Sequence, residues 1–138
     1  MIYLLDTNVC IVYLNGKNLN LKRQVEQKSD SDIAVCSPVK SELFYGARKS
    51  NNLSRTLSLQ KIFLNRFVSL AFDDQAAEIF GVIRARLTQL GTPIGPYDLQ
   101  IAAIALANDL ILVTHNINEF SRVEGLKLED WEALESDS

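Results

Sequence analysis

Short apolar runs alternate with amphipathic stretches along most of the chain. Four runs, at residues 2–5, 33–36, 67–72 and 110–114, predict buried strands, and a fifth short run covers 126–128. Between these runs, apolar residues recur every three or four positions, which predicts helices. Continuously apolar strands that alternate with amphipathic helices are typical of a three-layer α/β domain. We therefore expect a mostly parallel central sheet of four to five strands, flanked by helices.

Polar residues mark where the predicted helices begin and end. An Asp-Thr-Asn segment at 6–8 follows the first strand and suits a helix cap. Ser37 as the cap and Pro38 as the first helical residue predict the next helix start. A further helix is predicted over 52–66. Asp73 then begins a long helix that Gly91 ends, and the segment 95–98 opens another.

Size and composition predict a single domain over residues 1–138, because 138 residues with 47% hydrophobic side chains suffice for one core. The acidic tail at about 132–138 is expected to be flexible. No apolar run is long enough for a membrane span, and the N-terminus lacks the features of a signal peptide. We read Cys10 and Cys36 as reduced core residues. Together these features predict a cytoplasmic protein without a membrane partner.

The charge is polarised along the chain. The net charge of −3 argues mildly against a nucleic-acid partner, because binding a phosphate backbone needs cations. However, residues 40–66 hold six basic side chains and one acid, whereas the segment from 119 to the end holds seven acids and two basic residues. A basic helical face is usually a solvated surface, so this polarity adds little to the case for RNA binding.

Acidic residues follow the predicted strands in turn. Asp6 comes directly after the first strand, Glu42 lies early in the helix after the second, and Asp98 opens the helix before the fourth. The fourth strand is followed by further polar residues: Thr114, Asn116 and Glu119. In open parallel sheets, ligands bind at the carboxyl ends of the strands. We therefore expect these side chains to meet at one edge of the sheet.

A cluster of carboxylates calls for a cation, since the acids repel one another and lose solvation. Hard oxygen ligands favour Mg²⁺ or Mn²⁺ over zinc, and the lone His115 and the separated cysteines make no zinc site. Carboxylate-held Mg²⁺ suits phosphodiester hydrolysis. Each acid taken alone has a structural alternative: Asp6 and Asp98 suit helix N-termini, and Glu42 and Glu119 suit an exposed surface. Their joint placement favours the metal site.

Other common chemistries lack their motifs. The sequence has no G-x-G-x-x-G after a strand and no phosphate-binding loop of the G-x-x-x-x-G-K-[ST] type. An aspartyl-phosphate enzyme needs a second aspartate two residues after the first, where this chain has Asn8. A serine or cysteine triad would depend on the only histidine, and no nucleophile elbow is present.

Five segments resemble the PIN-domain family, specifically toxins of the VapC type. They are LLDTN at 4–8, SELFYGA at 41–47, GPYDLQIAA at 95–103, LVTHNINEF at 112–120 and LEDW at 128–131. The resemblance implies a PIN fold and a Mg²⁺- or Mn²⁺-dependent endoribonuclease that cuts structured RNA such as tRNA. It also implies a cognate antitoxin that blocks the acidic pocket, a homodimer, and a toxin–antitoxin hetero-oligomer. Two alternatives stay open: a housekeeping RNA-processing nuclease and a PIN module that binds RNA or protein without cutting.

The resemblance also implies roles for individual residues. Asp6, Glu42 and Asp98 match the family's three acids, with Asp6 and Asp98 as metal ligands and Glu42 holding a second ion or a water. At the fourth acidic position we expect Glu119 to face the pocket and Asn116 to support it.

Supporting roles fall to more residues. Groups that orient the carboxylates are expected at Thr7, Asn8, Thr114 and Asn116. Contact with RNA is assigned to Arg84 and Arg86, for which a plain surface role is the alternative. A groove for an antitoxin helix is expected from Val9, Ile11, Val12 and Leu14 with Leu53, Leu57 and Phe63, although core packing would account for about half of these.

Overall fold

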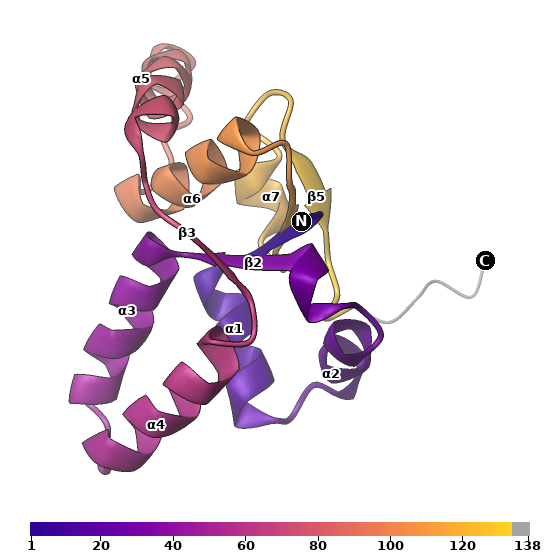
Figure 1. Ribbon diagram of the computed structural model, residues 1–138. Coiled ribbons are helices and arrows are strands. Elements are labelled where there is room, and N and C mark those ends of the chain that lie inside the picture. Colours follow the sequence, from indigo (N-terminus) through magenta and orange to yellow (C-terminus); the bar gives the residue numbers. More distant parts are fainter. Residues whose placement is uncertain (134–138) are drawn as a thin grey trace.

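The computed structural model describes residues 1–133 and forms a three-layer α/β domain (Figure 1). Five strands form one sheet in the order β3-β2-β1-β4-β5. Their bounds are β1 Tyr3–Leu5, β2 Ile33–Cys36, β3 Val68–Leu70, β4 Ile111–Val113 and β5 Lys127–Glu129. All four neighbouring pairs are parallel. The predicted fold class is confirmed, and the sheet is parallel throughout.

Helices cover both faces of this sheet. One face carries α1 Thr7–Asn15, α2 Leu19–Glu26, α3 Ser37–Arg48 and α4 Leu53–Leu64 (Figure 1). The other carries α5 Asp74–Gln89, α6 Pro96–Ala107 and the short α7 Ile117–Phe120. Right-handed crossovers require this division, since the chain moves outward from β1 to β3 and then returns past β1 to β4. The reversal between β1 and β4 is a topological switch point, where ligands bind in such sheets.

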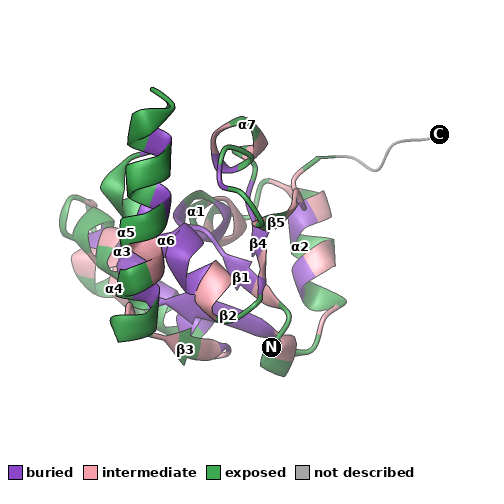
Figure 2. Ribbon diagram, turned by 90° about the horizontal axis from the view of Figure 1, so that it is seen from above, coloured by how far each residue is buried: buried purple, intermediate pink, exposed green. Residues whose placement is uncertain are grey.

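The core lies on both faces of the sheet, and α6 is its most deeply buried helix. Figure 2 shows α6 mostly buried, whereas α5 is largely exposed along its outer face. Five consecutive residues of α6, 101–105, are buried because the helix is covered by the sheet below and by α5 above. Cys10 and Cys36 are buried and free, as expected.

The helix boundaries follow the predicted caps with small shifts. The Asp73 carboxylate accepts a hydrogen bond of 2.9 Å from the Ala76 amide and so caps α5. Gly91, with φ 71°, follows the end of α5 in the left-handed conformation that glycine tolerates best. Helix α3 begins one residue earlier than predicted, because Cys36 is the cap residue. The Ser37 hydroxyl instead donates to the Leu70 carbonyl on β3.

Two helices had no sequence prediction, α2 and the four-residue α7, and α2 holds the C-terminal segment. Asn18 caps α2 through its side chain, which accepts from the Leu21 amide at 2.9 Å. Asn20 donates from its amide nitrogen to the carbonyls of Trp131 and Ala133, so the first residues of the acidic tail lie against α2. The rest of that predicted tail, residues 134–138, lies outside the described residues. Within residues 1–133, no helix has the length and apolar character needed to cross a membrane.

Candidate active site

Asp6 lies at the switch point of the sheet and is buried, with 4% of its surface exposed. It is the cap residue of α1, and its Oδ1 accepts a hydrogen bond of 2.8 Å from the Val9 amide. Its Oδ2 accepts a hydrogen bond of 2.5 Å from the hydroxyl of Thr114, which directly follows β4. Each carboxylate oxygen has two lone pairs, so one acceptor position on each oxygen remains for a ligand. Asp6 therefore caps a helix and still offers ligand atoms.

The residues after β4 form a connected hydrogen-bond network. The Asn116 amide N–H donates to the Thr114 hydroxyl oxygen at 3.0 Å. The Asn116 side-chain amide donates to Oε2 of Glu119 at 2.6 Å. The side chain of Asn116 thus holds Glu119 through a hydrogen bond, and the side chain of Thr114, two residues earlier, holds Asp6 in the same way. This arrangement matches a supporting position for Asn116 beside a carboxylate that faces the cluster.

Glu42 is held from the opposite side by α1. Its Oε1 accepts a hydrogen bond of 3.0 Å from the hydroxyl of Thr7, the residue after Asp6. Glu42 lies on the first turns of α3, which starts where β2 ends. The starts of α1 and α3 are therefore tied together next to the ends of β1 and β2.

Four acids influence one another through their charges. Burial, together with repulsion from Glu119, Asp6 and Glu42 in that order, raises the pKa of Asp98 to about 6. Burial also raises the pKa of Asp6; the hydrogen bonds from Thr114 and Val9 oppose this rise, and the charge of Glu42 adds to it. We call these four residues the acidic cluster: Asp6, Glu42, Asp98 and Glu119. A cation among them would relieve the repulsion.

Three further predicted site residues, Asn8, Arg84 and Arg86, differ in where the structure places them. Asn8 is exposed, and its backbone N–H, like that of Val9, lowers the pKa of Asp6. Arg84 lies on α5 with its guanidinium 5.8 Å from the centre of the Phe80 ring. Arg86 forms an ion pair of 2.5 Å with Glu124. Arg84 therefore lies near an aromatic ring of its own helix, and Arg86 is paired with an acid of this chain.

A second group of potential ligands beside the cluster was missed in the sequence. His115, Asp130 and Glu132 offer ligand atoms that lie within 4.8 Å of one another, and the His115 Nδ1 is 3.0 Å from Oδ2 of Asp130. Oε2 of Glu132 is buried without a hydrogen-bond partner among residues 1–133. The pairing of β4 with β5 brings the residues after each strand together. The predicted strand at 126–128 and the LEDW segment at 128–131 were the available signals, because they place Asp130 just after a strand.

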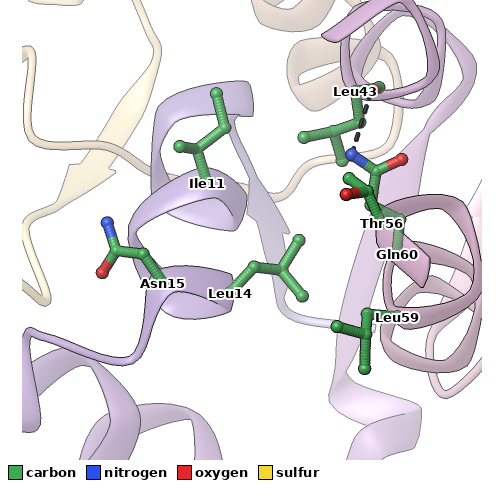
Figure 3. Close-up of a pocket in the computed structure, with 7 residues that line it drawn as sticks. All are labelled: Ile11, Leu14, Asn15, Leu43, Thr56, Leu59 and Gln60. Atoms are coloured by element: carbon green, nitrogen blue, oxygen red, sulfur yellow. Dashed lines mark hydrogen bonds between the residues drawn. The ribbon is translucent and has the colours of Figure 1, made fainter. Parts of the chain in front are cut away.

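An apolar groove lies between α1 and α4 (Figure 3). Ile11 and Leu14 of α1, Leu59 of α4 and Leu43 of α3 line it, and the Leu14 side chain points toward Leu59. The Gln60 amide donates to the Leu43 carbonyl at 2.9 Å, which joins α4 to α3 at the base of the groove. Of the residues predicted for such a groove, Ile11 and Leu14 line it, whereas Val9 and Phe63 are buried in the core.

Comparison with known proteins identifies the family. The family model of the PIN domain matches residues 3–126. A protein of Salmonella typhimurium named tRNA(fMet)-specific endonuclease VapC is 40% identical over 129 residues, which span 94% of this chain and 97% of that protein. Ribonuclease VapC2 of Rickettsia felis is 38% identical over 133 residues, spanning 96% of this chain and 99% of that protein.

A solved structure agrees with these sequence relatives. The VapBC complex of Salmonella typhimurium, crystallised with DNA, matches with a TM-score of 0.90 and 38% identity, over 95% of this chain and 98% of the matched chain. The likeness therefore extends over nearly the whole fold. The chain belongs to the PIN domain family and, within it, to the VapC-type ribonucleases.

Proposed function

We propose that this protein is the toxin of a type II toxin–antitoxin system, an endoribonuclease that requires Mg²⁺ or Mn²⁺ and cuts tRNA. The observation that carries the proposal is the placement of Asp98 where burial, and then the charges of Glu119, Asp6 and Glu42, raise its pKa to about 6. The similarity to a tRNA(fMet)-specific endonuclease supports the substrate. This assigns the four acids the catalytic role, with Asp6 and Asp98 as direct metal ligands.

The donor set of the acidic cluster fits a hard divalent cation. All four side chains offer carboxylate oxygens, which are the ligands that Mg²⁺ and Mn²⁺ prefer. When bound, the cation supplies an activated water and offsets charge on the phosphoryl and leaving oxygens. The chain's own residues fix the carboxylates in advance: Thr114 and the Val9 amide hold Asp6, Thr7 holds Glu42, and Asn116 holds Glu119. Such orientation by neighbouring hydrogen bonds is a common feature of metal sites.

The apolar groove is the proposed docking site of the antitoxin (Figure 3). Leu59 is 50% exposed and Ile11 is 46% exposed, so both present apolar surface to a partner. An amphipathic helix binds such a groove through residues spaced three or four apart. Solved relatives are VapBC complexes of toxin with partner, which supports an antitoxin as the occupant. We further propose one PIN domain over 1–138, a homodimer, and a cytoplasmic location.

The experiment that tests this function is a map of new RNA 5′ ends in bacteria after brief induction of the chain. Wild type is expected to arrest growth and to produce cuts in tRNA, and co-expression of the cognate antitoxin is expected to suppress both. Asp98→Asn is the matched control, because it keeps the side-chain shape and removes the charge. An identical pattern of cuts in wild type and Asp98→Asn would overturn the acidic-cluster mechanism.

A further inference from the structure

A hollow of about 500 Å³ adjoins the acidic cluster between α1, α3 and the start of α6. Its lining includes Thr7, Asn8, Glu42, Tyr45, Lys49 and Tyr97. The volume lies within the range of about 300–1,000 Å³ that small-molecule sites occupy. Glu42 belongs both to the lining and to the acidic cluster, so the two regions are continuous. We call this region the tyrosine hollow.

Each tyrosine of the hollow lies within three residues of an acid of the cluster along the sequence. Tyr45 follows Glu42 by three positions on α3, so the two side chains share one face of the helix. Tyr97 directly precedes Asp98 at the start of α6. Both rings project into solvent, with Tyr45 65% exposed and Tyr97 59% exposed. The folding core therefore accounts for little of their surface, and both rings line the hollow together with Glu42.

Lys49 supplies positive charge on the same lining. Its Nζ lies 4.5 Å from the centre of the Tyr45 ring. The acidic cluster repels phosphate, and the chain carries a net charge of −3, so an RNA strand that approaches the cluster needs local cations. Single-stranded nucleic acid is held by aromatic faces that stack on bases together with cations that follow the backbone. The tyrosine hollow offers both kinds of group within one cavity.

We propose that the tyrosine hollow is a nucleotide subsite for the RNA substrate. A base next to the scissile phosphodiester stacks on the rings of Tyr45 and Tyr97, and Lys49 pairs with the neighbouring phosphate. An unpaired base is required, because a base in a duplex keeps its faces covered by its neighbours. The hollow thereby selects a single-stranded loop as the place of cleavage. This inference rests on the proposed ribonuclease activity and assigns the residues that position its substrate.

The test is steady-state cleavage of a tRNA with Mg²⁺ present by Tyr45→Leu, Tyr97→Leu, Tyr45→Phe, Tyr97→Phe and Lys49→Gln. Loss of a stacked base is expected to raise KM about tenfold in each Leu variant, with kcat changed little, whereas the Phe variants keep the ring and stay near wild type. Lys49→Gln is expected to raise KM and to weaken the salt dependence of binding. Lys17→Gln, an exposed lysine outside the hollow, is the control.

Two further measurements separate the possible outcomes. Mn²⁺ affinity by calorimetry and the melting temperature are expected to match wild type in every variant, because none of these residues is a proposed metal ligand. Wild-type KM in both Leu variants would overturn the subsite while leaving the ribonuclease intact. An equal loss in the Phe and Leu variants would also overturn it, because stacking needs only the ring. Absence of cleavage by wild type itself would instead contradict the proposed function.

Discussion

The hydroxyl of Thr114 donates a hydrogen bond of 2.5 Å to Oδ2 of Asp6, joining residues that are 108 positions apart in the chain. The bond crosses the switch point between β1 and β4, where the two strands end side by side. Thr114 is fully buried and Asp6 nearly so. A buried carboxylate must keep its hydrogen-bond partners, so this contact fixes the position of the acid and contributes to the fold at the same time.

Thr114→Val is expected to lower the free energy of unfolding by about 1–3 kcal/mol, because it leaves a buried carboxylate oxygen without its donor at nearly constant side-chain volume. Activity should fall as well, since Asp6 loses its orientation. Thr114→Ser keeps the hydroxyl and is expected to retain most of both. Urea denaturation and RNA cleavage of the two variants provide the check. Equal stability of the Val variant and wild type would mean that the bond contributes nothing.

Asp6 combines a helix cap with a ligand position, and two substitutions separate these roles. Asp6→Asn keeps an oxygen that accepts from the Val9 amide, and its NH2 group can donate to the Thr114 hydroxyl oxygen in place of the bond that Thr114 donates in wild type. With repulsion also relieved, its stability should stay within about 0.5 kcal/mol of wild type. Asp6→Ala loses the cap and should be less stable by about 1 kcal/mol. Both variants should lose RNA cleavage.

Thermal unfolding without added metal, together with a cleavage assay, measures both effects. A cleavage-competent Asp6→Asn variant would show that the charge of Asp6 has no catalytic role and that the residue is only a cap.

The metal-free protein should lose stability as the pH rises through about 6. The pKa of Asp98 is raised to about 6 in the folded chain by burial and by the other acids, above the value of about 4 in the unfolded chain. Between about pH 4 and pH 6, Asp98 is therefore protonated in the folded state and ionised in the unfolded state. The contribution of protonated Asp98 to folding stability is fully present below about pH 4 and is lost as the pH rises through about 6.

Urea midpoints of wild type and Asp98→Asn between pH 4 and pH 7.5 test this effect. From pH 4 to pH 7.5, the free energy of unfolding of Asp98→Asn should rise by about 1 kcal/mol relative to that of wild type. The expected difference is modest because water screens the charge of a partly exposed group. Glu78→Gln, which changes an exposed acid on α5, is the control. A constant difference between wild type and Asp98→Asn at every pH would contradict the raised pKa.

Glu119 rather than Asn116 should complete the acidic cluster. Glu119→Gln removes a charge that acts on Asp98, and we expect Mn²⁺ affinity and the cleavage rate to fall at least tenfold. Asn116→Ala removes only the donor that holds Glu119 and should have a smaller effect. Calorimetry with Mn²⁺ compares the two variants directly. A larger loss in Asn116→Ala than in Glu119→Gln would reverse this assignment.

The strands and most helices were predictable because their signals are local. The run at 33–36 is continuously apolar and bounded by polar residues, and the strand occupies those four positions. Helix α2 was missed although the sequence carries a signal for it, since Asn18 caps it and its two buried residues, Leu21 and Val25, are four positions apart. The signal is short, and the hydrogen bonds from Asn20 to the distant residues Trp131 and Ala133 could not be predicted from it.

The convergence of the acids was predictable from the order of the strands, whereas the hydrogen bonds that hold them were not. Placing Asp6 and Glu42 after strand ends, and Asp98 at the start of the helix that leads into β4, needed only the order of the elements and the rule for parallel sheets. The pairing of Thr7 with Glu42, and the position of His115 beside Asp130, depend on side-chain directions that no residue pattern records. The tyrosine hollow could not be predicted for the same reason, because Tyr45 and Tyr97 come to line one hollow only through the packing of α3 near α6.

Cleavage of purified tRNA(fMet) by the purified chain tests the central claim most directly. Wild type should be inactive in EDTA and should cut the tRNA once Mg²⁺ or Mn²⁺ is added in excess, while Asp98→Asn should be at least about 100-fold slower under the same conditions, as expected when a catalytic charge is removed. Cleavage by wild type that continues in EDTA, or an Asp98→Asn variant that cuts as fast as wild type, would contradict a metal-dependent ribonuclease built on the acidic cluster.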